Sequence, residues 1–239
     1  MDEASAGLGN KPEPRMVIAI DGPAGSGKST LAALLAKKYG YTNIETGAMY
    51  RALALKALEK ASGVSLDDGD ALAALARNAH IELLPRAEGN RVLLDGVDVT
   101  DRIRRQDVTE AASRVSVHPP VREWMVERQR EIGAGGAIVM EGRDIGTKVF
   151  PGAAVKIFLD AAPEVRGTRR FLQSPAKAAP EASVLAELRA RDERDRTRAN
   201  SPLVPAPDAL LIDSTQLTLE QVVQRATAII DQKLAELKD

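Results

Sequence analysis

The chain has 239 residues, a length that fits one domain with an insertion better than two equal domains. Hydrophobic residues make up 44% and charged residues 28%, and the formal net charge of −1 argues against a nucleic-acid-binding protein with a dominant basic face. The absence of cysteine excludes disulfides, thiolate zinc sites and cysteine nucleophiles. No stretch reaches the roughly 20 apolar residues that span a bilayer, so we expect a cytoplasmic protein without a membrane segment.

Residues 1–15 are polar, rich in glycine and proline, and lack an apolar signal segment, so we expect a mobile tail. Met16–Asp21 is then a short apolar run ended by turn residues, which is typical of a buried parallel strand. A glycine-rich turn follows, and residues 29–40 have helical spacing and end in glycine. This order is that of a phosphate-binding βα unit. Thr42–Glu45 and a stretch from about Gly47 to Lys60 predict a second strand and helix.

The pattern changes from about Val64 to Arg105. A short helix at Asp70–Asn78 is followed by three short β-type runs, at His80–Leu84, Arg91–Asp95 and Val97–Val99. Antiparallel strands within an otherwise alternating βα chain predict a small subdomain, which we place at 64–105.

The second half returns to alternating helices and buried strands, and a Pro/Ala/Ser-rich stretch at Gln173–Ser183 predicts a mobile connection. The expected elements are a helix or helix pair at Thr109–Ile132 broken at Pro119-Pro120, strands at Ala137–Met140 and Val155–Asp160, helices at Glu164–Phe171 and Val184–Thr197, a strand at Ala209–Asp213, and a helix at Thr218–Leu237 begun by a capping pattern of Thr218 and Gln221. The predicted fold class is α/β. Its five-stranded parallel sheet, flanked by helices, would be built from 16–63 and 106–239, with a helical lid at about 167–198.

The strongest motif is GPAGSGKST, which contains the pattern G-x-x-x-x-G-K-[ST] of a P-loop. Its glycines let successive backbone N–H groups point at phosphate oxygens. Lys28 is expected to reach the β- and γ-phosphates of a nucleoside triphosphate, and the Ser29 hydroxyl to bind Mg²⁺. The alternative is a glycine-rich turn with a chance lysine, and the strand before and helix after disfavour it. The predicted triphosphate-binding residues are Gly22, Pro23, Ala24, Gly25, Ser26, Gly27, Lys28, Ser29 and Thr30.

Two further segments follow predicted strands, where ligands bind in open α/β sheets. TGAMYR (Thr46–Arg51) places Arg51 where it can grip a second phosphate, although an arginine on a helix is more often a surface residue. EGRD (Glu141–Asp144) offers an arginine and an aspartate to a phosphate and to a donor such as an exocyclic amine. The alternative for EGRD is a turn stapled by a local salt bridge.

The run RDERDRTR at Arg191–Arg198 is the fourth candidate. Such a run is normally a solvated helix face, yet Arg191, Asp195 and Arg198 fall at i, i+4 and i+7 on one face. Residues 166–198 hold nine basic and five acidic side chains, a net excess of four positive charges. This favours a lid that closes over phosphates.

In these motifs the sequence resembles the bacterial cytidylate kinases, of the nucleoside monophosphate kinase group. IDGPAGSGKST, TGAMYR, Ser113 and Arg122 ahead of ERQR, EGRDIGTKVFP, KIFLDA, RDERDRTR, PLVPA and IDST match that family in order. The resemblance covers roughly Met16 to Leu237, and the 64–105 insertion resembles the enlarged monophosphate-binding subdomain of bacterial members. Two departures, Glu141 for aspartate and Thr46 for serine, keep the chemical type.

The resemblance implies an enzyme that transfers the γ-phosphoryl group of ATP to CMP, and also to dCMP, with Mg²⁺ and as a monomer. It implies that Ser113, Arg122 and Asp144 recognise cytosine, that Arg51, Arg143 and Arg198 hold the monophosphate, and that Arg191 and Asp195 face the ribose. Thr46 joins the CMP-binding residues, and Lys28, Arg143 and Arg198 are the expected catalytic residues. With Asp144 in the role that the resemblance implies, uracil would set a carbonyl against its carboxylate, a buried mismatch that is strongly penalised.

Other functions of a P-loop remain as alternatives. A different small-molecule kinase would use AMP, UMP, dTMP or shikimate as its acceptor. A GTPase-type switch is disfavoured because the only N-K-x-x string, Asn10–Glu13, precedes the P-loop and ends in glutamate. An ABC-type ATPase is disfavoured by the lack of an LSGGQ-like string.

Overall fold

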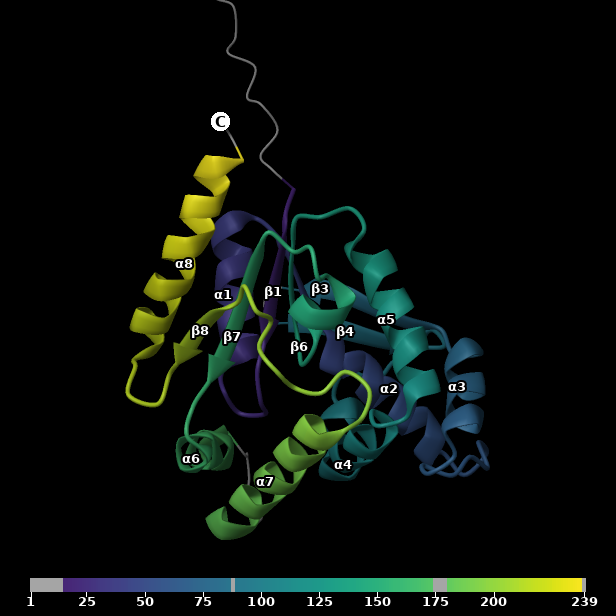
Figure 1. Ribbon diagram of the computed structural model, residues 1–239. Coiled ribbons are helices and arrows are strands. Elements are labelled where there is room, and N and C mark those ends of the chain that lie inside the picture. The colour runs from purple at the N-terminus through teal and green to yellow at the C-terminus, as the bar shows by residue number, and fades with distance from the viewer. Residues whose placement is uncertain (1–14, 87–88, 174–179, 238–239) are drawn as a thin grey trace, which may run out of the picture.

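The computed structural model describes residues 15–86, 89–173 and 180–237 (Figure 1). Five parallel strands form its main sheet in the order β2-β6-β1-β7-β8. They are β1 (Val17–Asp21), β2 (Thr42–Glu45), β6 (Ile138–Gly142), β7 (Val155–Asp160) and β8 (Leu210–Asp213). The five-stranded parallel sheet predicted from the alternating pattern is confirmed.

Alternation along β1 explains how the sheet is covered on both faces. Ile18 and Ile20 pack in one apolar cluster with α1 (Lys28–Tyr39) and α8 (Leu219–Glu236). Ala19 points the other way, into a cluster with α5 (Pro119–Gly133). Because successive side chains of a strand point to opposite faces, a strand covered on both sides is apolar throughout. The Thr218–Gln221 capping box at the start of α8 is present as predicted.

The segment from 64 to 105 contains α3 (Gly69–Arg77) and a three-stranded antiparallel sheet. Its strands are β3 (Ile81–Arg86), β4 (Gly89–Leu94) and β5 (Val97–Asp98), followed by the short 3-10 helix η1 (Arg102–Arg104). The apolar residues of this segment share one cluster with α2 (Thr46–Leu58), α4 (Gln106–Val115) and α5. The antiparallel strands are confirmed, whereas the subdomain boundaries at 64 and 105 stay a prediction.

The predicted break at Pro119 is real, and it separates α4 from α5. The EGRD segment, by contrast, continues into a helical turn that the pattern did not predict. This π-helical turn, η2 (Ile145–Val149), has backbone bonds from Lys148 and Val149 to the Asp144 carbonyl. The last two helices are α6 (Pro163–Gln173) and α7 (Glu181–Thr197).

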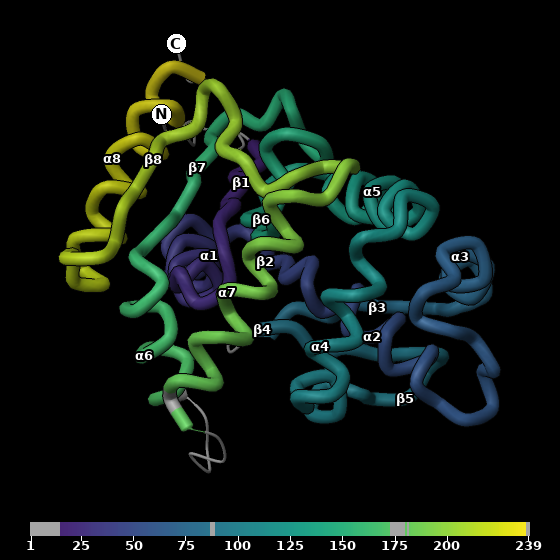
Figure 2. Tube along the Cα trace, turned by 60° about the horizontal axis from the view of Figure 1, so that its bottom comes forward, coloured from purple at the N-terminus to yellow at the C-terminus, as the bar shows by residue number. Residues whose placement is uncertain are grey.

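Figure 2 shows α7 running between α6 on one side and α4 on the other, as it also does in Figure 1. The predicted tail at 1–15, apart from Arg15, and the central part of the predicted mobile connection, 174–179, lie outside the described residues. Within the ranges that are described, no helix is long and apolar enough to cross a membrane.

Candidate active site

The P-loop joins β1 to α1 and is held in a conformation that requires glycine. Gly22, Gly25 and Gly27 have φ values of +149°, +76° and +97°. A Cβ on Gly22 would lie 2.0 Å from the carbonyl oxygen of Leu159, at the end of the neighbouring strand β7. The loop therefore has no room for a side chain at Gly22, and its backbone N–H groups are left to line the turn.

Lys28 is the first residue of α1, and its ammonium group lies inside the loop. Its Nζ donates to the Pro23 carbonyl at 2.7 Å and to the Ser26 hydroxyl at 3.4 Å. Burial, aided by the positive charge of Arg143, lowers the pKa of Lys28 to about 7, although Glu141 acts in the opposite direction. Desolvation and neighbouring cations both disfavour the charged form of a lysine, and a bound anion favours it.

Ser29 brings a second strand to the loop. Its hydroxyl donates to the carboxylate of Glu141 at 2.8 Å, and Glu141 lies near the end of β6, which pairs with β1. A hydroxyl and a carboxylate at adjacent positions are the hard oxygen ligands that Mg²⁺ accepts when phosphates complete its shell. Thr30 follows on α1 and is exposed.

Asp21, the last residue of β1, connects the P-loop to the EGRD segment. Its carboxylate accepts the backbone N–H groups of Ile145 and Gly146 at 2.8 and 2.7 Å. Burial raises the pKa of Asp21 to about 6, despite these two hydrogen bonds. The pairing fixes the turn that begins at Asp144, so the geometry of the two segments is set by one buried carboxylate.

Arg122 and Asp144, both predicted to recognise the base, lie together in the interior. The Arg122 guanidinium donates to the Asp144 carboxylate at 2.5 Å and to the Ser116 carbonyl at 3.0 Å. Its guanidinium carbon also lies 5.6 Å from the centre of the Tyr50 ring. The Arg122 side chain is only 3% exposed and that of Asp144 7%, so this ion pair is shielded from solvent.

Ser113 and Thr46 are brought to the same region. Ser113 lies in α4, is buried, and accepts the Nε–H of Arg194 on α7 at 3.1 Å. Its carbonyl accepts the hydroxyl of Ser116, which connects it to the Arg122 site. The Thr46 hydroxyl donates to the Glu141 carbonyl at 2.8 Å, so it also ties α2 to β6.

Two of the three arginines predicted to hold a phosphate, Arg143 and Arg198, bond to one carboxylate, that of Asp195. Arg143 donates to Asp195 at 2.9 Å through Nε, and Arg198 donates to it at 3.4 Å. Burial opposes ionisation of Asp195, but Arg143, Arg191 and Arg198 outweigh it and lower the pKa of this carboxyl. Helix α7 is thereby tied to the EGRD segment through Asp195.

Several buried guanidinium nitrogens in the described part of the chain have no hydrogen-bond partner. They belong to Arg51, Arg122, Arg191 and Arg198. Burial, together with the like charge of Arg143, lowers the pKa of Arg191 to about 10. Arg51 also pairs with Glu45 at the end of β2. Because an unpaired buried donor is costly, such a group of cations fits an anionic ligand that supplies the missing acceptors.

The two predicted sites are adjacent. The positive charges of Arg143 and Arg191 lower the pKa of Lys28, so these two arginines lie near the P-loop lysine. In this arrangement a triphosphate on the loop and a second phosphate among the arginines would be neighbours, as transfer between them requires.

Four residues of the site were missed by the sequence analysis. Tyr50 lies beside Arg51, and burial raises its pKa to about 12. Asp21 ends a strand immediately before the loop, a position that the sequence alone could have flagged. Arg166 is buried in α6 and donates to the Ala24 carbonyl and to the Asp192 carboxylate on α7. Nothing in the basic segment that contains Arg166 and Arg194 distinguishes them from surface arginines.

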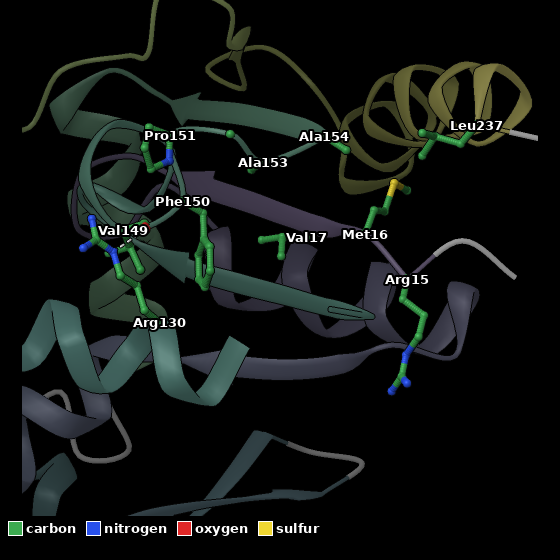
Figure 3. A pocket seen from close by; sticks show the side chains of 11 residues that line it. Arg15, Met16, Val17, Arg130, Val149, Phe150, Pro151, Ala153, Ala154 and Leu237 are labelled. Atoms are coloured by element: carbon green, nitrogen blue, oxygen red, sulfur yellow. Dashed lines mark hydrogen bonds between the residues drawn. The ribbon is translucent and has the colours of Figure 1, made fainter. Parts of the chain in front are cut away.

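A separate cavity of about 810 Å³ lies away from this site (Figure 3). Its lining is mainly apolar and includes Met16, at the start of the first strand, and Leu237, at the end of α8. None of the predicted site residues lines it, and it contains none of the phosphate-binding features described above.

A parallel sheet with a P-loop at the end of its central strand, faced by a second group of arginines, defines a P-loop phosphotransferase. A model of the family described as cytidylate kinase matches residues 18–232. The chain is 47% identical over 222 residues to the cytidylate kinase of Pasteurella multocida, covering 92% of this chain and 97% of that protein. It is 49% identical to the cytidylate kinase of Geobacillus kaustophilus, with 92% and 98% covered.

The chain therefore belongs to the cytidylate kinase family, a family of nucleoside monophosphate kinases. The fold is also found in the crystal structure of an uncharacterized protein from Eubacterium ventriosum. That structure has a TM-score of 0.50 at 12% identity, with 90% of this chain and 98% of that chain covered.

Proposed function

We propose that this chain transfers the γ-phosphoryl group of ATP to CMP, and also to dCMP, forming ADP and CDP or dCDP. The observation that carries the proposal is the group of buried guanidinium nitrogens without a partner, together with the Arg122–Asp144 pair. One member of the group, Arg191, lies near enough to the P-loop lysine to lower its pKa. The unpaired guanidinium nitrogens suit a second phosphate near the triphosphate. The Arg122–Asp144 pair suits a base with both donor and acceptor atoms.

ATP binds with its phosphates on Gly22–Thr30, where the backbone N–H groups and the Lys28 ammonium bind the negatively charged phosphate oxygens. The donor set fits Mg²⁺, because Ser29 and Glu141 present a hydroxyl and a carboxylate side by side. Bound there with the phosphates, Mg²⁺ neutralises charge on the transferred group. Glu141 thus adds to the expected site a metal-binding role, direct or through water, that the motif analysis gave to Ser29 alone.

CMP binds with its base against Ser113, Arg122 and Asp144, its phosphate among Arg51, Arg143 and Arg198, and its ribose near Arg191 and Asp195. Thr46, between α2 and β6, completes this set. The Asp144 carboxylate accepts a hydrogen bond from the amino group of cytosine. This bond replaces part of the hydrogen bonding between Asp144 and Arg122. Uracil carries a carbonyl at that position, so both groups would be desolvated without forming a bond.

The transfer itself needs no general base. The attacking atom is an oxygen of the CMP phosphate, which is largely deprotonated at neutral pH because its second pKa is about 6. Lys28, Arg143 and Arg198 then hold the two phosphates in line and stabilise the charge of the transition state. The work of the protein is positioning and charge neutralisation, which fits a site without histidine.

We further propose that 167–198 acts as a lid, that the 64–105 segment is the monophosphate-binding subdomain, and that the enzyme is a cytoplasmic monomer. The ion pair between Arg143 and Asp195 and the bond between Arg194 and Ser113 support the lid, since both join α7 to the acceptor site. The proposed donor and acceptor residues all lie in this chain, so the reaction needs no residue from a second subunit.

Transfer from γ-labelled ATP tests this function directly. With ATP, Mg²⁺ and CMP, the label is expected in CDP, and omission of CMP should leave ATP intact. Release of inorganic phosphate without labelled CDP, or labelling of a different acceptor such as shikimate, would overturn the proposal.

A further inference from the structure

The bond between Arg194 and Ser113 joins the proposed lid to the proposed base site. Arg194 lies on α7, and its Nε–H donates to the Ser113 hydroxyl oxygen at 3.1 Å across 81 residues of sequence. Ser113 is only 3% exposed, whereas the rest of Arg194 reaches the surface. A second contact, from Gln106 to Glu187 at 2.6 Å, also connects α4 to α7.

The bond determines how the serine hydroxyl can act toward a ligand. A guanidinium has only donors and stays charged, so Arg194 donates its hydrogen bond to one lone pair of the serine oxygen. The hydroxyl proton itself donates to no acceptor among the residues that the structure describes. It is therefore free for an acceptor that arrives with the ligand.

The same bond makes the serine oxygen a poorer acceptor for any other group. A donor bonded to a hydroxyl oxygen polarises it, which strengthens its O–H as a donor. A ligand that offers only an N–H to Ser113 would leave the hydroxyl proton buried and unpaired, at a cost comparable to a lost hydrogen bond. Cytosine carries a ring acceptor at N3, whereas uracil carries an N–H there.

We propose that Arg194 is a positioning residue for base selection, which holds the Ser113 hydroxyl in the donor role that favours cytosine over uracil. The proposal rests on the proposed function, because it assigns the base to the Ser113 region. It also makes base selection depend on the docking of α7, since Arg194 reaches Ser113 only from that helix.

A double-mutant cycle tests this inference with the full chain. Values of kcat/KM for CMP and for UMP are measured with ATP for the wild type, Arg194→Ala, Ser113→Ala and the double variant. Arg194→Ala is expected to lower the preference for CMP over UMP about tenfold, the effect of one charged hydrogen bond. In the Ser113→Ala background it should have no further effect on that preference. Arg194→Lys, which is also a donor without an acceptor, should keep most of the preference.

Arg189→Ala is the matched control. Arg189 lies on the same helix, is 58% exposed and pairs with Glu164 on α6, so its loss should leave the preference unchanged. Equal losses for CMP and UMP in Arg194→Ala would show a structural tether and overturn the inference. If Arg194→Ala lowers the preference for CMP just as strongly in the Ser113→Ala background, the inference is also overturned. Failure of the wild type to phosphorylate CMP would instead overturn the proposed function.

Discussion

The two halves of the site are built in different ways. The donor half is one continuous segment of nine residues, Gly22–Thr30, shaped by glycines at positive φ and lined by backbone groups. The acceptor half collects side chains from α2, α4, α5, the EGRD segment and α7. Its charged groups already pair with one another, as Arg122 does with Asp144 and Arg143 with Asp195.

This difference teaches how each half selects its ligand. A backbone loop binds phosphates of any nucleotide, because every residue carries an N–H group. Paired side chains select more strictly, since a ligand must replace the interactions that it disturbs. We therefore expect changes in the donor half to reduce turnover generally, and changes in the acceptor half to alter the choice of substrate.

The largest expected effect is that of Lys28→Ala. Loss of the ammonium group among the phosphates should lower turnover about 10³-fold, the cost of removing one strong transition-state donor. The loss should be similar for every acceptor that the enzyme uses. A coupled assay of ADP formation measures it, and Lys37→Ala, an exposed change on the same helix, serves as the control. Near-normal turnover in Lys28→Ala would mean that the loop does not act as a phosphate cradle.

Asp21 joins the two halves, and the second-largest expected effect is the change in stability as its carboxyl titrates. Its pKa in the folded protein, about 6, lies above the ordinary value of 3.8. The contribution of Asp21 to stability is therefore fully present below pH 4 and is lost as the pH rises through 6. The loss corresponds to about 3 kcal/mol in the free energy of unfolding.

Asp21→Asn removes this titration and is the reference for measuring it. Urea unfolding between pH 4 and 7 should show wild-type stability falling relative to Asp21→Asn as the pH rises. If the difference in the free energy of unfolding stays constant, or grows in favour of the wild type, the pKa of the Asp21 carboxyl is not raised.

Asp144→Asn should change the choice of substrate in the acceptor half. The amide keeps the shape of the carboxylate but loses its charge, so kcat/KM for CMP is expected to fall about 30-fold, with a smaller loss for UMP. The ratio of the two values is informative, because it does not depend on the fraction of folded enzyme. Equal losses would remove Asp144 from base recognition.

The smallest expected effect belongs to Tyr50. Its ring lies under the Arg122 guanidinium, a contact worth about 1 kcal/mol, so Tyr50→Leu should raise the KM for CMP about fivefold. Tyr50→Phe keeps the ring and should behave nearly as the wild type does. If the two variants lose affinity equally, the hydroxyl rather than the ring is what matters.

The predictability of the two halves from sequence follows the same division. The P-loop was predictable because its strand, glycines and lysine are neighbours in the chain. Short strand-like runs alternating with helical stretches located all five strands of the main sheet. The helix break at Pro119 was predictable because proline lacks an N–H.

The contacts of the acceptor half were not predictable in this way. Arg194 meets Ser113 across 81 residues, and Arg166 reaches Ala24 across 142, so no local pattern reports either contact. The π-helical turn after Asp144 depends on the buried Asp21 carboxylate, 124 residues from Ile145. The resemblance to a family named most acceptor residues, but not those that position them.

An acceptor comparison tests the central claim most directly. Initial rates with ATP and Mg²⁺ are measured for CMP, dCMP, UMP, AMP and dTMP, each offered separately over a range of concentrations. The account predicts that kcat/KM is highest for the two cytosine nucleotides and lower for UMP by at least tenfold, a difference set by buried hydrogen bonds. A higher value for AMP, UMP or dTMP would contradict it.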